Sequence, residues 1–310
     1  MEHMKQKICG IPISKLTLGT VQFGIPYGIS NKNGKPNTKT VFEILEYALK
    51  NGINSFDTSP AYGRSEKILG SYLNKKKINT IIMTKIPKIG ITDKKLSFSE
   101  IYKIAKLSVV HSLKNLNVHK LPICLLHNPN DMFSHNGLVV DALIKMKKEG
   151  LISKIGVSTY SPNEVKYFLE RKQFDAIQIP ISLIDTRLIK NGLLSELETE
   201  KKIIFARSIY LQGLILLSKS SIPNHLKPIS KYLDKLYRIC STTNLSILEL
   251  AFLFVRDLKE ISSILVGVES KKQLKKNIEM LSLSPLSDEI RDKILKIGTP
   301  TENIIDPSKW

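Results

Sequence analysis

Short apolar runs alternate along the chain with longer segments in which apolar residues recur every three or four positions. The runs TIIMTKI, PICLLH, AIQIPI and SILVGV are apolar almost throughout, which is typical of parallel strands buried on both faces. The segment with Val41, Ile44, Leu45, Ala48 and Leu49 has the spacing of an amphipathic helix. The pattern therefore predicts a repeated strand–helix unit.

Eight such units are expected in the 310 residues. In chain order, the expected strands and the helices that follow them are Lys15–Phe23 and Thr38–Asn51; Ile53–Asp57 and Ser65–Lys76; Ile78–Ile86 and Ser99–Leu116; Leu121–Leu126 and Gly137–Glu149; Ile152–Ser158 and Pro162–Arg171; Ala176–Ile181 and Leu188–Lys201; Ile203–Ile209 and helices across Pro228–Asp257; Ile261–Val268 and Lys271–Leu281. This repeat favours a (β/α)8 TIM barrel over an open doubly wound sheet. Leu18–Gly28 lacks a Rossmann glycine fingerprint, and no linker divides the chain. We expect one α/β domain, residues 1–310.

Helix ends carry their own signals. Glycines expected at the ends of helices are Gly52, Gly70 and Gly150. Residues expected at N-caps, the last two with Glu164 or Gln273 three positions later, are Thr38, Ser65, Ser99, Ser161 and Ser270.

The charge is strongly positive, with a formal net charge of +19. The lysines are scattered through every expected helix, whereas specific nucleic-acid readers favour arginine and gather charge on one face. The composition therefore indicates a solvated lysine-rich surface and no nucleic-acid partner. Such a surface still attracts anionic substrates such as phosphates or nucleotide sugars.

No run of about eighteen apolar residues is present, and the N-terminus lacks the apolar core of a secretion signal. We therefore expect no membrane partner. Cys9, Cys124 and Cys240 are far apart and lack the spacing of a metal site. They predict reduced thiols, a cytoplasmic location and no bound metal.

Polar residues stand at the ends of three consecutive expected strands. Asp57 ends one strand and Tyr62 follows in its loop; Lys85 lies near the end of the next, and His127 follows the third. Separately, each has an ordinary explanation as a turn residue, a snorkelling lysine or a cap. In a barrel, however, all four converge at the C-terminal ends of the strands. Lys85 and Asp57 form the obvious buried ion pair.

This group suits the reduction of a carbonyl. A phenol with a pKa of about 10 is a poor acid at neutral pH. The ammonium of Lys85, held by Asp57, is expected to lower the pKa of Tyr62. Tyr62 would then donate a proton to a developing alkoxide, while His127 would orient the carbonyl. The group lacks only a hydride donor.

The segment DTSPAYGRSEKILG resembles the signature of the aldo-keto reductase superfamily, and Asp57, Tyr62, Lys85 and His127 look like its tetrad. The likeness runs from LTLGTVQFG through GVSTY to LVGVESKKQLKKNIE. It implies a nicotinamide dinucleotide as hydride donor, bound without a Rossmann motif. By this resemblance, the cofactor-binding residues would be Thr20 and Asp57 near the nicotinamide, Ser158 and Gln178 on the carboxamide, Arg207 stacked on the ring, Ser208, Gln212 and Gly213 around the pyrophosphate, and Gly267, Gln273 and Asn277 at the adenosine.

The chain departs from the family pattern at several positions. Thr159 and Pro180 replace a common Asn and a common acidic residue, and Gly267 and Gln273 replace the Lys and Arg that grip a 2′-phosphate in many members. Lysines that could supply this charge instead, or simply face solvent, are Lys271, Lys272, Lys275 and Lys276. We expect NADPH, with NADH as the alternative.

The insertion FGIPYGISNKNGKP resembles a branch of the superfamily associated with bacterial carbohydrate biosynthesis. Phe23 and Tyr27 in this segment either line a substrate pocket or pack the loop onto the barrel. Trp310 lies either in the barrel mouth or on its wall. The expected substrate is a small aldehyde or ketone, such as a sugar derivative, and the expected state is a monomer or a weak homo-oligomer.

Two other functions fit parts of the same pattern. The chain could be a non-catalytic, nicotinamide-binding regulatory protein, which would bind the cofactor and turn over no carbonyl. It could also be a lyase in which Lys85 forms a Schiff base. The intact group of four residues argues against the first, and the expected cofactor residues argue against the second.

Overall fold

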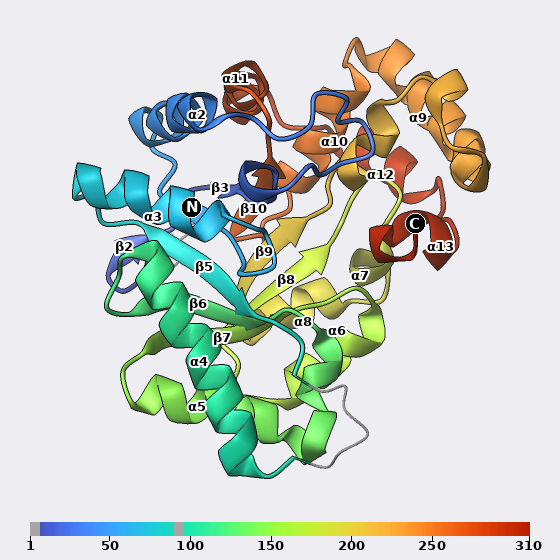
Figure 1. The fold of residues 1–310 in the computed structure, drawn as a ribbon. Helices are drawn as coiled ribbons and strands as arrows, with labels where there is room; N and C mark the ends of the chain where they lie inside the picture. Colours follow the sequence, from blue (N-terminus) through green and yellow to red (C-terminus); the bar gives the residue numbers. More distant parts are fainter. Residues whose placement is uncertain (1–6, 90–95) are drawn as a thin grey trace.

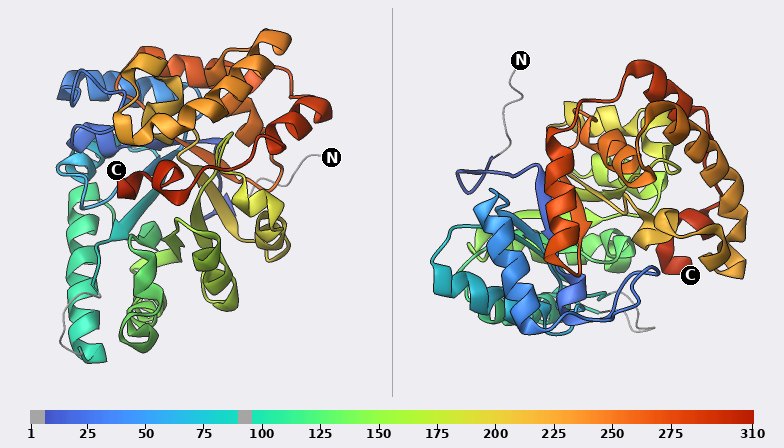
Figure 2. Two further views of the ribbon diagram at one scale, coloured as in Figure 1. Left: turned by 90° about the vertical axis from the view of Figure 1, so that its right-hand side faces the viewer. Right: turned by 90° about the horizontal axis from the view of Figure 1, so that it is seen from above.

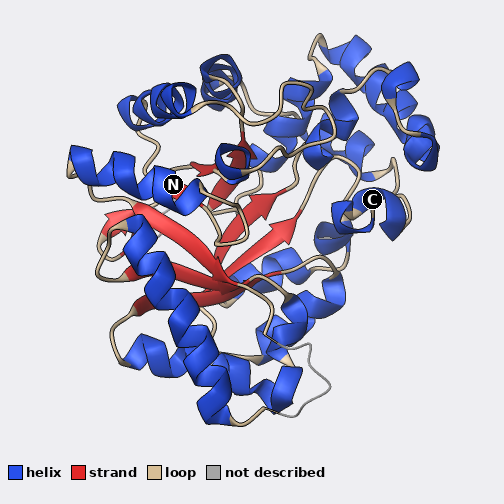
Figure 3. Ribbon diagram, viewed as in Figure 1, coloured by secondary structure: helices blue, strands red, loops and turns tan. Residues whose placement is uncertain are grey.

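The computed structural model describes residues 7–89 and 96–310. Eight parallel strands close into a barrel in the order β10-β3-β4-β5-β6-β7-β8-β9, which is the central layer in Figures 1 and 3. The strands are β3 (Leu16–Gly19), β4 (Ser55–Asp57), β5 (Ile81–Ile86), β6 (Leu121–Leu126), β7 (Ile152–Ser158), β8 (Ala176–Pro180), β9 (Ile203–Arg207) and β10 (Ser263–Gly267). The predicted (β/α)8 barrel is confirmed.

Helices surround the strands in all the views of Figures 1 and 2. They are α1 (Val21–Gly24), α2 (Thr38–Lys50), α3 (Ser65–Lys76), α4 (Phe98–Leu116), α5 (Leu138–Lys148), α6 (Pro162–Glu170), α7 (Arg187–Lys190), α8 (Leu193–Thr199), α9 (Ser230–Thr243), α10 (Ile247–Arg256), α11 (Lys271–Glu279), α12 (Asp288–Leu295) and α13 (Glu302–Ile305).

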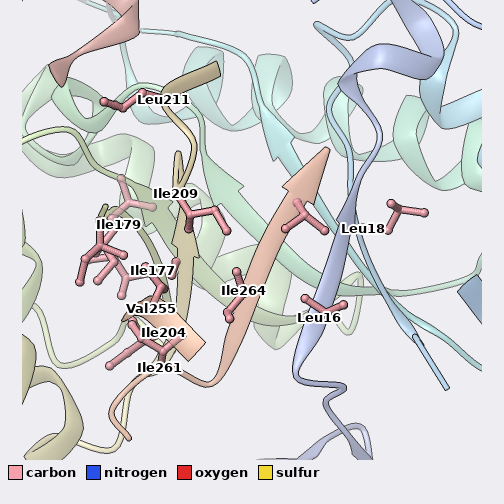
Figure 4. Close-up of a cluster of buried hydrophobic side chains, with 14 of the residues drawn as sticks. Leu16, Leu18, Ile177, Ile179, Ile204, Ile209, Leu211, Val255, Ile261 and Ile264 are labelled. Atoms are coloured by element: carbon pink, nitrogen blue, oxygen red, sulfur yellow. The ribbon is translucent and has the colours of Figure 1, made fainter. Parts of the chain in front are cut away.

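The strands bury both of their faces in separate clusters. Outward residues such as Leu16, Leu18 and Ile264 join the large cluster shared with the helices (Figure 4). Inward residues such as Met83 and Phe205 form a smaller cluster. This two-sided burial explains why the strands are apolar runs rather than alternating ones.

A short hairpin that the sequence did not predict precedes the barrel. Strands β1 (Lys7–Ile8) and β2 (Ile11–Pro12) pair antiparallel around two residues with positive φ, Cys9 and Gly10. Ile8 and Ile13 are buried in the inward-facing cluster. The hairpin therefore contributes apolar side chains to the inner core of the barrel.

Several predicted boundaries were wrong. The strand expected at Lys15–Phe23 stops at Gly19, because the chain turns there into α1. The helix expected at Leu188–Lys201 is two helices, because Gly192 adopts a φ of 78° between them. The helices expected across Pro228–Asp257 are α9 and α10, with Asn244, at a φ of 56°, between them.

The capping predictions were partly right. Ser161 and Ser270 are N-caps with complete capping boxes, and Gly52 and Gly150 follow helices with positive φ. The N-caps expected at Thr38, Ser65 and Ser99 fall instead at Asn37, Arg64 and Ser97. Gly70 lies inside α3, where a Cβ would stand 2.2 Å from the backbone oxygen of Asn115. The residue permits α3 and α4 to pack closely rather than ending a helix.

No single helix in the described ranges is long and apolar enough to cross a membrane. Two consecutive helical segments, Asn224–Thr243 and Ile247–Arg256, are together long and apolar enough to cross a membrane, by length and composition only. They are bent by 90° where they meet. In this fold, six consecutive residues of α10, from Leu250 to Val255, are buried.

Candidate active site

Side chains alternate between the two faces of each strand, so the last inward position of each strand points into the barrel mouth. One cavity of about 440 Å³ lies there. Eight residues near the strand ends line it: Gly19, Asp57, Lys85, His127, Ser158, Gln178, Arg207 and Gly267. The strand register thus gathers residues that are up to 248 positions apart into one site.

Asp57 is the hub of this site. Its Oδ1 accepts hydrogen bonds from Lys85 Nζ and from Gln178 Nε2, both at 2.5 Å. Lys85 Nζ also donates to the backbone oxygen of Thr58 at 3.1 Å. Asp57 and Lys85 are 4% and 2% exposed, so this is a buried ion pair with additional hydrogen bonds, as the sequence predicted.

Tyr62 is held beside this pair by close backbone packing. A Cβ on Gly24 of α1 would lie 1.5 Å from the backbone oxygen of Tyr62, so only glycine permits this approach. Lys85 Nζ lies 5.0 Å from the centre of the Tyr62 ring. The His127 ring meets the Tyr62 ring edge-on, with centroids 5.9 Å apart. The four predicted residues therefore lie together.

The predicted effect of Lys85 on the acidity of Tyr62 was wrong. Burial, followed by the negative charge of Asp57, raises the pKa of Tyr62 well above its ordinary value. The ammonium of Lys85 is largely neutralised by the carboxylate 2.5 Å away, so little positive charge remains to favour a phenolate. Tyr62 is consequently a protonated phenol across the physiological pH range.

His127 is neutral in this site. Burial, with the nearby cations Lys85 and Arg207, lowers the pKa of His127 to about 3. Its Nδ1 lies 3.3 Å from the hydroxyl of Ser59. A neutral imidazole carries one N–H donor, which suits it to hydrogen-bond an oxygen without transferring a full charge.

Arg207 lies across the mouth with its guanidinium 4.4 Å from the centre of the Tyr160 ring. It donates to the backbone oxygen of Thr159 at 2.7 Å and to the hydroxyl of Ser208 at 3.0 Å. Its buried Nε has no hydrogen-bond partner among the described residues. One face of the guanidinium plane is thus stacked on Tyr160, and the Nε–H donor of Arg207 has no described partner at the cavity wall.

The loop after β9 is strained where it borders the cavity. Ser208, Leu211 and Gln212 have φ values of 60°, 47° and 54°, and Gly213 has 89°. Gln212 Nε2 donates to the hydroxyl of Tyr27 at 3.0 Å, and the same residue's backbone oxygen accepts from the amide of Ile29 at 3.1 Å. Non-glycine residues with a left-handed backbone conformation are strained, and surrounding contacts must hold them in place. Such residues cluster at functional sites.

Most, but not all, of the predicted site residues reach the cavity. Besides the residues at the strand ends, the cavity is lined by Tyr27, Tyr62, Ser208, Gln212, Gly213 and Gln273. The structure does not bring Thr20, Phe23 or Asn277 to it. Thr20 is buried, with its hydroxyl donating to the backbone oxygen of Asp57 at 2.8 Å. Phe23 is fully buried in the core, and Asn277 accepts from the hydroxyl of Tyr210 at 2.8 Å.

Sequence reasoning missed other residues of the lining, notably Gln22, Tyr160, Glu269 and Ser308. Tyr160 stands two residues after Ser158, where a strand was predicted to end, so its position was a usable signal. Gln22 was not recognised as a lining residue because the first strand was expected to continue to Phe23. No local pattern singles out Glu269 or Ser308, because both enter the site from loops whose paths are set by distant packing.

A second cavity, of about 490 Å³, adjoins the first and shares His127, Tyr160 and Ser308 with it. Its wall is polar. It presents amides and hydroxyls, together with charged side chains of both signs, from Lys88, Asn128, Asn130, Ser161, Asn163, Glu164, Arg187, Glu302, Asp306 and Lys309. Glu302 accepts from Arg187 at 3.3 Å and from Lys309 at 2.8 Å, so much of this charge is balanced.

The described residues contain no group of three or more His, Cys, Asp or Glu side chains that could hold a metal ion. Trp310, for which two places were expected, packs against the large core cluster. Its neighbours Pro307 and Ser308 line the first cavity.

The first cavity suits an elongated ligand with phosphate and amide groups. Arg207 Nε and Gln22 Oε1 are a buried donor and a buried acceptor that lack partners among the described residues. Ser208 and Gln212 add polar side chains to the same wall, where they can bind phosphate oxygens. The donor set therefore fits a nicotinamide dinucleotide.

The model of the Aldo/keto reductase family matches residues 15–298. The chain is 26% identical to the NADH-specific methylglyoxal reductase of Escherichia coli (strain K12), over 90% of this chain and 92% of the relative. It is also 26% identical to the L-galactose dehydrogenase of Arabidopsis thaliana, over 96% and 95%. The holo form of an aldo-keto reductase from Bacillus halodurans has the same fold, with a TM-score of 0.73 at 21% identity, covering 99% of this chain and all of that chain. The chain belongs to the aldo/keto reductase family, a family of oxidoreductases.

Proposed function

We propose that this protein reduces an aldehyde or ketone to an alcohol, with Tyr62 as the proton donor. The observation that carries the proposal is the juxtaposition of a protonated, buried phenol with a neutral imidazole and a buried ion pair. When bound, a nicotinamide dinucleotide supplies the hydride.

Each residue has a distinct task. The neutral His127 donates a hydrogen bond to the carbonyl oxygen and orients it. Tyr62 gives its proton to the same oxygen as negative charge develops there, because an alkoxide is a much stronger base than a phenolate. The Lys85–Asp57 pair holds an ammonium near the phenol, 5.0 Å from the ring centre, and stabilises the phenolate that forms.

The lyase alternative needs a free, neutral amine at Lys85. Its Nζ is instead buried and bonded to Asp57 and to the carbonyl of Thr58. This arrangement supports an electrostatic role for Lys85 and argues against a Schiff base.

The polar second cavity supports a polyhydroxylated substrate such as a sugar derivative. Asn128, Asn130 and Asn163 offer both donors and acceptors, and sugar hydroxyls require both. Balanced charges, rather than a surplus of one sign, suit a neutral molecule better than a highly charged one. The names of the relatives include both a methylglyoxal reductase and a sugar dehydrogenase. The cytoplasmic location, the single domain and the monomeric or weakly associating state stay predictions.

The test is Tyr62→Phe, assayed for cofactor binding and for reduction of a panel of sugar aldehydes, ketoses and methylglyoxal. We expect nicotinamide binding to be retained and kcat to fall by about 10²–10⁴. Tyr72→Phe is the matched control, since its buried hydroxyl has no partner among the described residues and lies outside the cavity. A variant Tyr62→Phe that reduces carbonyls at near wild-type rate would refute the assignment of the acid. A wild type that binds the cofactor but reduces no member of the panel would favour the regulatory alternative.

A further inference from the structure

We propose that Glu269 makes this protein select NADH over NADPH, by accepting a hydrogen bond from the 2′-hydroxyl of the adenosine ribose and repelling a 2′-phosphate. The proposal rests on the function proposed above. It reverses the preference for NADPH expected from the sequence.

The position of Glu269 in the cavity defines which half of the cofactor it meets. The reacting nicotinamide must lie beside Tyr62 and His127, at the ends of β4 to β6. The cavity continues past Arg207 and the loop after β9, and reaches the loop between β10 and α11. That loop carries Glu269, so the adenosine half of a dinucleotide is the part that lies against it.

Three of the backbone donors at the start of α11 are already occupied. Gln273 Oε1 accepts from the amides of Glu269 and Ser270, at 2.7 and 3.2 Å. The amide of Gln273 in turn donates to the hydroxyl of Ser270 at 3.3 Å. This capping box leaves fewer amides free to bind an anion at the helix N-terminus.

Three of the four lysines that might have supplied positive charge contact other side chains. Lys271 lies over the ring of Tyr47, at 5.1 Å from its centre. Lys275 and Lys276 pair with Glu279 and Glu249, at 3.8 and 2.8 Å. None of the four lysines of α11 lines the cavity, and the cationic side chains in its described lining are Lys85 and Arg207.

The groups that do face this end are acceptors. Glu269 Oε2 accepts from Gln273 Nε2 at 3.3 Å, and a carboxylate has room for further donors on its oxygens. Gln22 Oε1 is buried without a partner in the described part of the chain. The Gln22 amide also lies where a side chain at Gly267 would begin, 2.6 Å from its Cβ position. This end therefore offers acceptors to ribose hydroxyls. Rossmann folds that bind NAD also use a carboxylate as the partner of the unphosphorylated ribose.

The experiment is a calorimetric titration of the purified protein with NADH and with NADPH, for the wild type and for Glu269→Gln. We expect the wild type to bind NADH about 10- to 100-fold more tightly than NADPH, the size of a lost charged hydrogen bond. Glu269→Gln should reduce that ratio about tenfold, mainly by tightening NADPH. Glu279→Gln, at the exposed far end of the same helix, is the matched control and should leave the ratio unchanged.

The outcomes separate the two proposals. Equal affinities or tighter NADPH binding by the wild type would overturn the role of Glu269 and leave the reductase function intact. An unchanged ratio in Glu269→Gln would also overturn it. If neither nucleotide binds, the proposed reductase function itself fails. A variant that does not fold is detected by circular dichroism, and the wild-type ratio then decides.

Discussion

Replacing Lys85 by Met should strongly destabilise the protein, because it leaves the Asp57 carboxylate buried without its counter-ion. At the observed Nζ–Oδ1 distance of 2.5 Å, and an effective dielectric constant of about 20, the attraction is about 7 kcal/mol. Most of that offsets the cost of removing both ions from water. Once the cation is gone, only the Gln178 amide still compensates the desolvated carboxylate.

We therefore expect Lys85→Met to lower the free energy of unfolding by about 3–5 kcal/mol. The double variant Asp57→Asn/Lys85→Met should recover at least about 2 kcal/mol of that loss, because it buries no charge. Lys293→Met provides the control: its pair with Glu289 is exposed, at 52% and 76%, and its loss should cost less than about 0.5 kcal/mol.

The assay is urea unfolding followed by circular dichroism for the wild type, the three single variants Lys85→Met, Asp57→Asn and Lys293→Met, and the double variant. The difference between the double variant and the sum of its single variants gives the coupling between Asp57 and Lys85. The reasoning is refuted if Lys85→Met lies within about 1 kcal/mol of the wild type. It is equally refuted if the losses of the two single variants simply add.

Two further predictions concern backbone packing and pH. Gly156→Ala in β7 should cost about 2 kcal/mol or more, because its Cβ would lie 1.8 Å from the backbone oxygen of Ala176; urea unfolding measures this, and a loss below about 0.5 kcal/mol would contradict it. The pKa of His127 is lowered to about 3 by burial and by nearby cations, so the unfolded chain takes up its proton first as the pH falls. The wild type should lose about 2 kcal/mol of unfolding free energy at this site between about pH 7.5 and 5. His127→Asn should lack this loss, and parallel pH profiles for the two proteins would disprove the shift.

Much of the fold could be predicted from the sequence, because the apolar patterns of strands and helices are local. A strand buried on both faces must be apolar along its whole length, and a helix at the barrel surface must be apolar on one side. The eight strands followed from these two patterns. Period two within a strand then places Asp57, Lys85 and His127 on the inward side near the strand ends, so their convergence needed only the assumption of a barrel.

The tertiary structure decided the pKa values and hydrogen-bond partners, because these depend on residues that are far apart in the chain. Lys85 was expected to acidify Tyr62, but burial and the Asp57 carboxylate outweigh the paired ammonium. Gln178 lines the cavity where a cofactor-binding residue was expected, and its amide also donates to Asp57, 121 residues away.

The same distinction explains the charge where the cavity meets the loop between β10 and α11. The sequence shows four lysines in the α11 segment, and only packing reveals that Lys271, Lys275 and Lys276 turn to Tyr47, Glu279 and Glu249 while Glu269 faces the cavity. Residue type and periodicity are set along the chain and predict which face a residue occupies. Desolvation and electrostatic potential depend on every neighbour in three dimensions, so the acidity of the site and the charge along its wall follow from the folded structure.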